Sequence, residues 1–384
     1  KRFLADRGLS EDDYTVPERG FRIRAWGAEF AGAVSQPVAR QELIDMPLDN
    51  GTAKKIQLTE RLPAICASAQ EYSGWKERKS RGHLGTASLR DNGEIWLGID
   101  SGTTTTKIVA VDEDDNIVFT YYAPNGGNSI KAAKKGLEEL RAQCRDSDIS
   151  LRIAGSCSTG YGEDLLKAAL NLDNGIIETI AHYVAARKVD PNVSFILDIG
   201  GQDMKAIFVD HGVLSRMELN EACSSGCGSF IETFARSLNY EVADFAREAC
   251  FAAEPCDLGT RCTVFMNSKV KQVMREGATV GDIAAGLSYS VVKNCLYKVL
   301  KLKKSEDLGG GVVVQGGTMR NDSVVRAFEQ LSGAEGGRSD HPELMGAYRC
   351  ALQARTVAEG KHVTRDPLLD TAEYHARPIN CGGC

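Results

Sequence analysis

Short apolar runs with the length of β-strands occur in two separate groups along the chain. The runs of the first group lie at residues 95–100, 107–112 and 116–122, and those of the second group at 194–199, 204–209 and 212–219. Short turns join the runs within each group, which predicts two antiparallel meanders. Because the order of strand, polar turn, strand, strand and helix occurs twice, the sequence indicates an internal repeat of architecture.

Segments with helical periodicity follow each group of strands. Residues 129–144 place apolar side chains at positions 130, 133, 137, 140 and 144, the three-and-four spacing of one buried helix face. Further helices are expected at 163–170, 177–188, 241–250, 263–276, 280–302, 322–332 and 343–355, and further strands at 151–155 and 312–315. This alternation of strands and helices predicts an α/β fold.

Residues 1–93 differ from the rest of the chain. They hold few periodic stretches, and the charged run 76–83 is typical of a solvated linker. The four parts that we expect are the tail of a preceding repeat plus a linker (1–93), a first lobe (94–192), a second lobe (193–356) and a C-terminal extension (357–384).

Composition excludes several classes of partner. The 46 Lys and Arg residues are outnumbered by 52 Asp and Glu residues, so no basic surface for nucleic acid or anionic lipid is expected. No apolar run reaches the roughly 18 residues of a membrane helix. We therefore expect a cytoplasmic protein, in which the 12 cysteines stay reduced and any with ligand chemistry bind a metal or cluster.

The first polar turn runs from Asp100 to Lys107 and offers hydroxyl and backbone N–H groups that can wrap a phosphate. Asp100 would hold a hydrated Mg²⁺, and Lys107 would supply positive charge. The other candidate contacts in this turn are Ser101, Gly102, Thr103 and Thr104. Taken alone, such a turn is more often structural, and the spacing of a P-loop is absent.

Two further turns make the combination specific. The second follows the run 194–199, and its glycines allow close backbone approach while its carboxylates can bind Mg²⁺ or orient water. Its candidate residues are Asp198, Gly200, Gly201, Gln202, Asp203 and Lys205. The third turn, 316–321, lies between a buried strand and a helix, where a nucleoside can rest against the backbone. Its candidate residues are Gly316, Gly317 and Asn321.

Residues 94–356 resemble the activators of 2-hydroxyacyl-CoA dehydratases and the related ATPase subunits of benzoyl-CoA reductases, within the acetate/sugar kinase, Hsp70 and actin superfamily. The matching segments are 98–107, 158–162, 198–205, 220–226, 262–265 and 316–321. The resemblance implies two ribonuclease-H-like lobes with ATP in the cleft between them, and it adds Gly160 and Gly162 to the nucleotide contacts. It also implies catalytic roles for Asp100, Asp198, Gln202 and Asp203.

The same resemblance implies an ATP-driven, one-electron reductant whose [4Fe–4S] cluster lies between two ATPase modules. Each module would give two cysteines, here Cys223 and Cys262. Both precede a predicted helix, where the helix dipole and free N–H groups favour a thiolate. Cys227 and Cys256 are the alternative ligands, and all of these thiols could instead be ordinary core residues.

The implied partners are an acyl-CoA dehydratase or reductase that accepts the electron, a low-potential donor such as ferredoxin or flavodoxin, and a second ATPase module. That module would be a second copy of the chain or a repeat within a longer chain. Two alternative functions stay open, a small-molecule kinase of the same superfamily and a non-enzymatic, ATP-gated scaffold.

Two features depart from the family pattern or add to it. Asn267 stands where the activators commonly have a glutamate, and Lys269 follows two residues later, so this helix departs from the family pattern where contacts with ATP or a partner would be made. Glu178 and His182 lie four residues apart on a predicted helix, where satisfied surface or interface residues are more common than catalysts.

The ends of the chain suggest a piece of a longer protein. The first residue is Lys1, not Met, and Gly27-Ala28 weakly matches Gly346-Ala347 of the last predicted helix, as a preceding ATPase repeat would. Cys381 and Cys384 would then open a cysteine-rich stretch. An unliganded, exposed pair in the tail is the simpler expectation.

Overall fold

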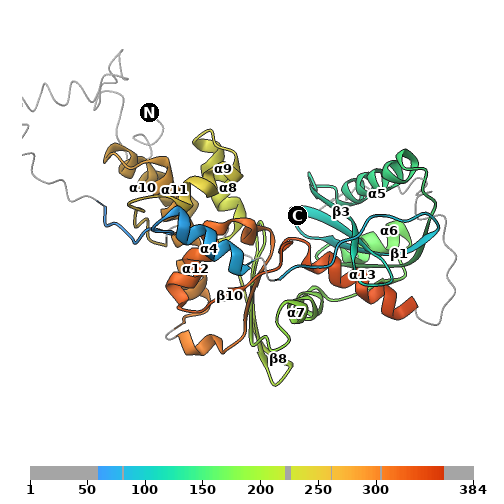
Figure 1. The fold of residues 1–384 in the computed structure, drawn as a ribbon. Helices are drawn as coiled ribbons and strands as arrows, with labels where there is room; N and C mark the ends of the chain where they lie inside the picture. The colour runs from blue at the N-terminus through green and yellow to red at the C-terminus, as the bar shows by residue number, and fades with distance from the viewer. Residues whose placement is uncertain (1–58, 80–81, 221–225, 261, 303–304, 359–384) are drawn as a thin grey trace, which may run out of the picture. The chain divides into compact units, whose positions relative to one another are not determined.

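The structure is a computed structural model, and it describes residues 59–79, 82–220, 226–260, 262–302 and 305–358 (Figure 1). The residues before 59 and after 358 lie outside the described part, and with them the predicted preceding repeat and the Cys381–Cys384 pair. No helix in the described ranges is long and apolar enough to cross a membrane.

The first sheet is built from the first group of predicted strands. Its members are β1 (Gly93–Ser101), β2 (Thr105–Val111), β3 (Ile117–Pro124), β4 (Leu151–Thr159) and β5 (Asn174–Gly175). They are hydrogen-bonded in the order β3-β2-β1-β4-β5, with β1 antiparallel to β2 and parallel to β4. Residues 95–101 of β1 are all buried, as expected for a central strand that helices cover on both faces.

The second sheet repeats this arrangement. Its members are β6 (Phe195–Ile199), β7 (Met204–Asp210), β8 (Val213–Asn220), β9 (Val312–Gln315) and β10 (Gly336–Gly337). Their order is β10-β9-β6-β7-β8, and β6 is again antiparallel to the next strand and parallel to the strand on its other side. The two sheets therefore have the same topology, which confirms the internal repeat of architecture.

The helices lie at the positions that the apolar periodicity of the sequence predicts. Those of the first half are α5 (Ser129–Asp146), α6 (Glu163–Leu170) and α7 (Glu178–Val189). Those of the second half are α8 (Gly228–Ser237), α9 (Val242–Cys250), α10 (Thr263–Arg275), α11 (Val280–Lys293), α12 (Asp322–Ser332) and α13 (Met345–Ala358). The predicted helix 280–302 is wrong in its second half, because α11 ends at Lys293 and a wider π-helical turn, Asn294–Val299, follows. That turn keeps Cys295 and Leu296 fully buried.

Helix α13 packs against the first sheet, although it is the last described helix in the chain. Figure 1 shows α13 and α5 on opposite faces of this sheet, and their side chains form separate apolar clusters with alternate residues of β1. Gly98 of β1 permits this contact, because a Cβ at this position would collide with the backbone oxygen of Ala347. The sequence analysis assigns the segment of α13 to the second lobe (193–356), so it does not predict that this helix packs on the first sheet. The division of the two lobes near residue 192 stays a prediction.

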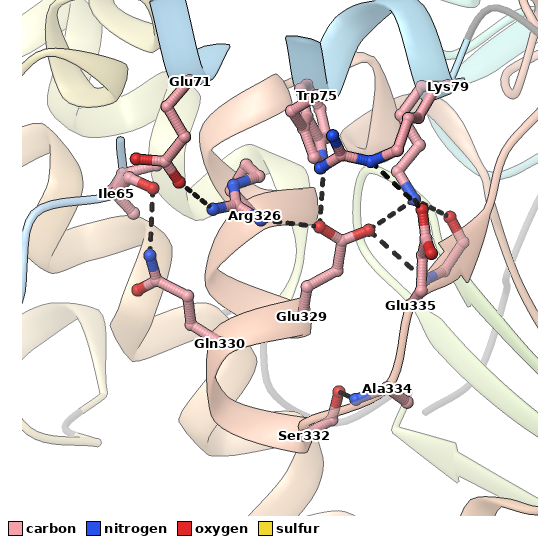
Figure 2. Close-up of polar contacts among 12 residues, drawn as sticks. Ile65, Glu71, Trp75, Lys79, Arg326, Glu329, Gln330, Ser332, Ala334 and Glu335 are labelled. Carbon is pink, nitrogen blue, oxygen red and sulfur yellow. Dashed lines mark hydrogen bonds and ion pairs between the residues drawn. The ribbon is translucent and has the colours of Figure 1, made fainter. Parts of the chain in front are cut away.

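The segment before the first sheet is also structured. Helix α4 (Ala69–Lys79) packs on α12 through Trp75, which is fully buried. The indole Nε1 of Trp75 donates to Glu329 at 2.7 Å, and Lys79 Nζ lies 2.6 Å from the same carboxylate (Figure 2). Lys79 is only 7% exposed. The expectation that the charged run 76–83 is solvated is therefore wrong at Lys79, because a distant helix supplies its counter-charge.

Candidate functional site

A cavity of about 240 Å³ lies where the three predicted turns meet. The predicted residues that line it are Asp100, Gly102, Thr103, Thr104, Lys107, Asp198, Gly200, Gly201, Gln202, Asp203, Lys205, Gly316 and Gly317. Further lining residues are Thr105, Tyr122, Tyr161, Glu178, His182 and Glu343, none of which the sequence analysis assigned to the site. The structure thus brings together turns that are separated by more than 200 residues in the chain.

The first hairpin presents a buried ion pair to the cavity. Asp100 and Lys107 face each other across β1 and β2, and their carboxylate and ammonium groups lie 3.1 Å apart. Burial alone would lower the pKa of Lys107, but attraction to Asp100 outweighs it and raises that pKa. The other carboxylate oxygen of Asp100, Oδ1, is buried and has no hydrogen-bond partner among the described residues. It is therefore free to meet a ligand.

Asn125 fixes the shape of this hairpin, a role that the sequence analysis missed. Its side-chain nitrogen donates to the carbonyl oxygen of Gly102 at 2.7 Å, and its Oδ1 accepts from the Thr106 hydroxyl at 2.6 Å. Its backbone N–H donates to the carbonyl oxygen of Thr104 at 2.8 Å. An asparagine just after β3 carries no periodic signal, so only the fold reveals the contact.

Three of the predicted nucleotide contacts, Ser101, Gly160 and Gly162, do not line the cavity. They pack against one another next to the first hairpin. Ser101 is fully buried, and its carbonyl oxygen accepts from the backbone N–H of Gly162 at 2.9 Å. A Cβ on Gly160, which has a φ of 88°, would lie 2.6 Å from that same oxygen. Glycine at this position is therefore required by packing as well as by backbone conformation.

The second hairpin approaches the first very closely. Its turn is closed by a hydrogen bond from Gly200 N–H to the Asp203 carbonyl oxygen at 3.0 Å. A Cβ on Gly201 would lie 2.5 Å from the hydroxyl oxygen of Thr104 in the first hairpin. The two turns therefore face each other across the cavity with no space for a larger side chain at Gly201.

Helix α7 places two charged residues beside the second hairpin. His182 Nδ1 lies 2.7 Å from Asp198 Oδ2, and His182 Nε2 lies 3.6 Å from Glu178 Oε1. Burial lowers the pKa of His182, but the two carboxylates outweigh it and raise that pKa to about 10. Burial raises the pKa of Glu178, but its ion pairs with His182 and Lys205 outweigh burial and hold that pKa below its ordinary range. The sequence shows the i, i+4 spacing of Glu178 and His182 but not that the carboxylate of Asp198 faces His182. Both Glu178 and His182 line the cavity.

The third turn connects the second hairpin to α12. The Thr318 hydroxyl donates to the Gly200 carbonyl oxygen at 2.8 Å, and Gly316, with a φ of 93°, donates its N–H to the Pro342 carbonyl oxygen at 2.8 Å. The side chain of Asn321 caps α12, since its Oδ1 accepts from the Ser323 N–H at 3.0 Å. Asn321 is thus placed at the end of the turn and does not line the cavity.

The candidate cysteines differ in exposure. Cys223 lies outside the described residues, whereas Cys262 is exposed and stands at the N-cap of α10. Cys227 and Cys256 are fully buried, and burial raises the pKa of Cys256 to about 11 although Arg61 lowers it. Within the described ranges, no group of three or more His, Cys, Asp or Glu residues is arranged to hold a metal ion. Of the three described thiols, Cys262 is the one that can reach a group outside the chain.

The two residues that depart from the family pattern both lie on α10. Asn267 is exposed, while Lys269 Nζ donates to the Thr59 hydroxyl at 2.8 Å. Neither lines the cavity between the hairpins. Lys269 instead joins α10 to the segment that precedes α4.

Several known proteins are similar to this chain in sequence and in fold. The (R)-2-hydroxyglutaryl-CoA dehydratase activating ATPase of Acidaminococcus fermentans is 30% identical over 259 residues, which cover 67% of this chain and 96% of that protein. The structure of the activator of the 2-hydroxyisocaproyl-CoA dehydratase from Clostridium difficile, with bound ADPNP, is similar with a TM-score of 0.62 and 28% identity. That match covers 71% of this chain and 98% of the activator.

Component A of the Acidaminococcus fermentans (R)-2-hydroxyglutaryl-CoA dehydratase matches with a TM-score of 0.58 at 29% identity, over 69% of this chain and 99% of that one. These likenesses confirm the expected fold, two α/β lobes of the actin-like ATPase type. Residues 97–352 match the BadF/BadG/BcrA/BcrD ATPase family. With two thirds of the chain inside that match, and with the repeated hairpins that the fold places around one cavity, this protein belongs to the BadF/BadG/BcrA/BcrD ATPase family.

Proposed function

We propose that this chain is an ATP-dependent reductive activator, which binds and hydrolyses ATP in the cavity between the hairpins. The hydrolysis would drive transfer of one electron from a [4Fe–4S] cluster to a partner of the acyl-CoA dehydratase or reductase type. The observation that carries the proposal is the pair of facing hairpins, each with a carboxylate and a lysine at one cavity. The matched relatives are named as activators of 2-hydroxyacyl-CoA dehydratases, which supports the class of partner.

The residues of the first hairpin fit a magnesium nucleotide. Asp100 Oδ1 is buried without a hydrogen-bond partner in the described structure, and such an atom is costly unless a ligand meets it. A hydrated Mg²⁺ would satisfy it and, when bound, would neutralise charge on the phosphates. The hydroxyl and N–H groups of residues 102–105 would hold the phosphates, with Lys107 as the nearby cation.

The residues of the second hairpin fit the hydrolytic step. Asp198, Gln202 and Asp203 line the cavity opposite the first hairpin, where they can accept hydrogen bonds from an attacking water and orient it. Lys205 forms ion pairs with Asp203 and Glu178, so its charge is held at the cavity wall. Fixed charges of this kind stabilise a developing negative charge without having to reorganise during the reaction.

The exposed thiol of Cys262 fits a cluster ligand. It stands at the N-cap of α10, and its exposure allows a group outside the chain to be shared with a second module. With Cys223 as the second ligand, each of two modules would give two thiolates, from two copies of the chain or from a repeat. The cluster, when bound, would supply a one-electron carrier, which a donor such as ferredoxin or flavodoxin would reduce.

The test is anaerobic purification followed by iron analysis and an ATPase assay. We expect brown protein with about four irons per two modules, the content of one [4Fe–4S] cluster, and ATP hydrolysis without added sugar or carboxylate. Colourless protein that phosphorylates a small molecule would overturn the proposal in favour of a kinase. Colourless protein that binds ATP without turnover would overturn it in favour of a scaffold.

A further inference from the structure

The two hairpins use their lysines differently, although their strands have the same register. In the first hairpin, Asp100 faces Lys107 across the sheet and pairs with it at 3.1 Å. In the second hairpin, Asp198 faces Lys205 in the corresponding register. However, Lys205 Nζ lies 2.9 Å from Glu178 and is also paired with Asp203, while the Asp198 carboxylate pairs with His182. An imidazole from a helix thus pairs with the aspartate of the second hairpin, as the lysine does with Asp100 in the first.

His182 is held from three directions. Its side chain is 7% exposed, and its two ring nitrogens face Asp198 of β6 and Glu178 of its own helix. From β9, the side-chain nitrogen of Gln315 lies 2.9 Å from Nδ1 and 3.3 Å from the carbonyl oxygen of His182. Gln315 directly precedes the third turn, and Asp198 lies at the second. His182 therefore connects α7 to both of these turns, through its ring to Asp198 and through its carbonyl oxygen to Gln315.

From this geometry we propose that His182 is a positioning residue of the ATPase reaction, which holds the carboxylates of Asp198 and Glu178 in their orientation at the cavity. This inference rests on the proposed function and names a residue that acts within it. His182 would act through these two carboxylates and would not itself carry out a chemical step.

The charge distribution argues against a purely structural role. Three carboxylates, Asp198, Asp203 and Glu178, meet two cations, Lys205 and His182, and all five residues line one cavity. Buried ion clusters are often no more stabilising than apolar residues of the same volume, so stability alone does not explain this one. Small errors in the orientation of a reacting group, in contrast, can cost about 100-fold in rate.

The experiment compares His182→Ala with His182→Asn in the full chain. The asparagine amide can take the place of Nδ1 and keep a hydrogen bond to Asp198, while alanine keeps none. We expect His182→Ala to lower kcat for ATP hydrolysis by about 10- to 100-fold, with KM for ATP and the affinity for ADP changed by less than about threefold. His182→Asn should recover a clear part of kcat. Tyr183→Phe, which removes a neighbouring hydroxyl on α7 that donates to the Gly212 carbonyl oxygen, is the matched control and should behave like wild type.

A double substitution tests the connection to Asp198. If His182 acts through this carboxylate, His182→Ala should reduce kcat much less in an Asp198→Asn background than in the wild-type chain. Wild-type kcat in His182→Ala would overturn the inference while leaving the proposed function intact. Equal losses in the alanine and asparagine variants, with a matching loss of thermal stability, would also overturn it. A wild-type chain that hydrolyses no ATP would overturn the proposed function itself and the inference with it.

Discussion

Lys79 and Glu329 form a buried ion pair that joins α4 to α12 across most of the length of the chain, with Nζ 2.6 Å from Oε1. The lysine side chain is 5% exposed and the carboxylate 8%. Glu329 also accepts a hydrogen bond from the Trp75 indole and pairs with Arg326 at 3.1 Å (Figure 2). One carboxylate therefore receives donors from both helices.

Removing this carboxylate charge should destabilise the protein. Glu329→Gln would leave the Lys79 ammonium buried without its main counter-charge, and breaking a buried pair in this way typically costs about 3–5 kcal/mol. We expect a loss of this size in the free energy of unfolding, measured by urea denaturation. Arg78→Gln is the control, because Arg78 and Glu335 are both more than half exposed and such pairs contribute about 0–1 kcal/mol. Equal small effects in both variants would show that α4 is not anchored by Glu329.

Much of the fold could be predicted from the sequence because each lobe is built from local patterns that repeat. The strand runs, the apolar face of α5 and the glycine turns are visible within short windows, and their duplication indicated two similar sheets. The three turns that meet at the cavity could also be predicted, because each directly follows a strand.

The missed features depend on partners far away in the chain. A charged run at 76–83 has the composition of a solvated segment, and only the docked helix α12 makes Lys79 a buried residue. His182 looked like an ordinary member of an i, i+4 pair, because no sequence pattern shows that Asp198 lies 2.7 Å from its ring. Gly98 in the run 95–100 indicates that some other part of the chain packs closely on β1. The sequence does not show that this part is α13.

The contact between β1 and α13 gives a second prediction for stability. Gly98→Ala would place a methyl group against the Ala347 carbonyl oxygen and close to the backbone nitrogen of Ala351, so α13 would have to move. Overpacking of this kind typically costs about 1–3 kcal/mol, which a urea titration resolves. Gly310→Ala is the control, because a Cβ there has no atom within 4 Å. If the two variants are equally stable, helix α13 can shift freely over the sheet.

The carboxylates of the hairpins should be required for turnover. Asp100→Asn and Asp203→Asn each remove a negative charge from the cavity while nearly keeping the shape of the side chain. We expect each to lower kcat for ATP hydrolysis by about 100-fold, since each removes charge that positions Mg²⁺ or water. Asp210→Asn, at the far, exposed end of β7, should leave kcat unchanged. Normal turnover in both hairpin variants would mean that the catalytic carboxylates lie elsewhere.

The pair formed by His341 and Glu343 should make stability depend on pH. The hydrogen bond to Glu343 is the main cause that raises the pKa of His341 above its ordinary value of 6.5. A histidine whose pKa is raised in the folded state contributes to the free energy of unfolding. This stabilisation is fully present below pH 6.5 and is lost as the pH rises through the pKa of the folded state. His341→Asn should therefore lower Tm more at pH 6 than at pH 9, by an amount that corresponds to less than about 1 kcal/mol. His211→Asn, whose side chain is 94% exposed, should show no such difference.

The cysteine assignment predicts which substitutions remove iron. Cys262→Ser and Cys223→Ser should each abolish the cluster. Both should leave ATP binding intact, because the residues that line the cavity come from other segments of the chain. Cys227→Ser and Cys256→Ser should keep most of the iron, since both thiols are fully buried. Iron analysis of the four anaerobic preparations decides between the two pairs. Full iron in the Cys262→Ser protein would reject Cys262 as a ligand.

Nucleotide and cluster should also be coupled, and hydrogen bonds in the second lobe indicate by which path. The N–H groups of Gly228 and Ser229, at the start of α8, donate to the carbonyl oxygens of Gly200 and Gly201 at 3.0 and 2.8 Å. Movement of the second hairpin would therefore be transmitted directly to the start of α8, close in sequence to Cys223.

A ligand shifts such an equilibrium only by its different affinity for the two states, so ATP and ADP must act differently on the cluster. We expect ATP to change the rate of iron removal by a chelator, and reduction of the cluster to change nucleotide affinity by a factor of about 5–150. Thr318→Val, which removes the hydroxyl bond to the Gly200 carbonyl oxygen, should weaken this coupling while both sites remain filled. If chelation and nucleotide affinity are independent in an iron-loaded wild-type protein, ATP hydrolysis cannot drive the electron transfer through this lobe, even with every ligand assigned correctly.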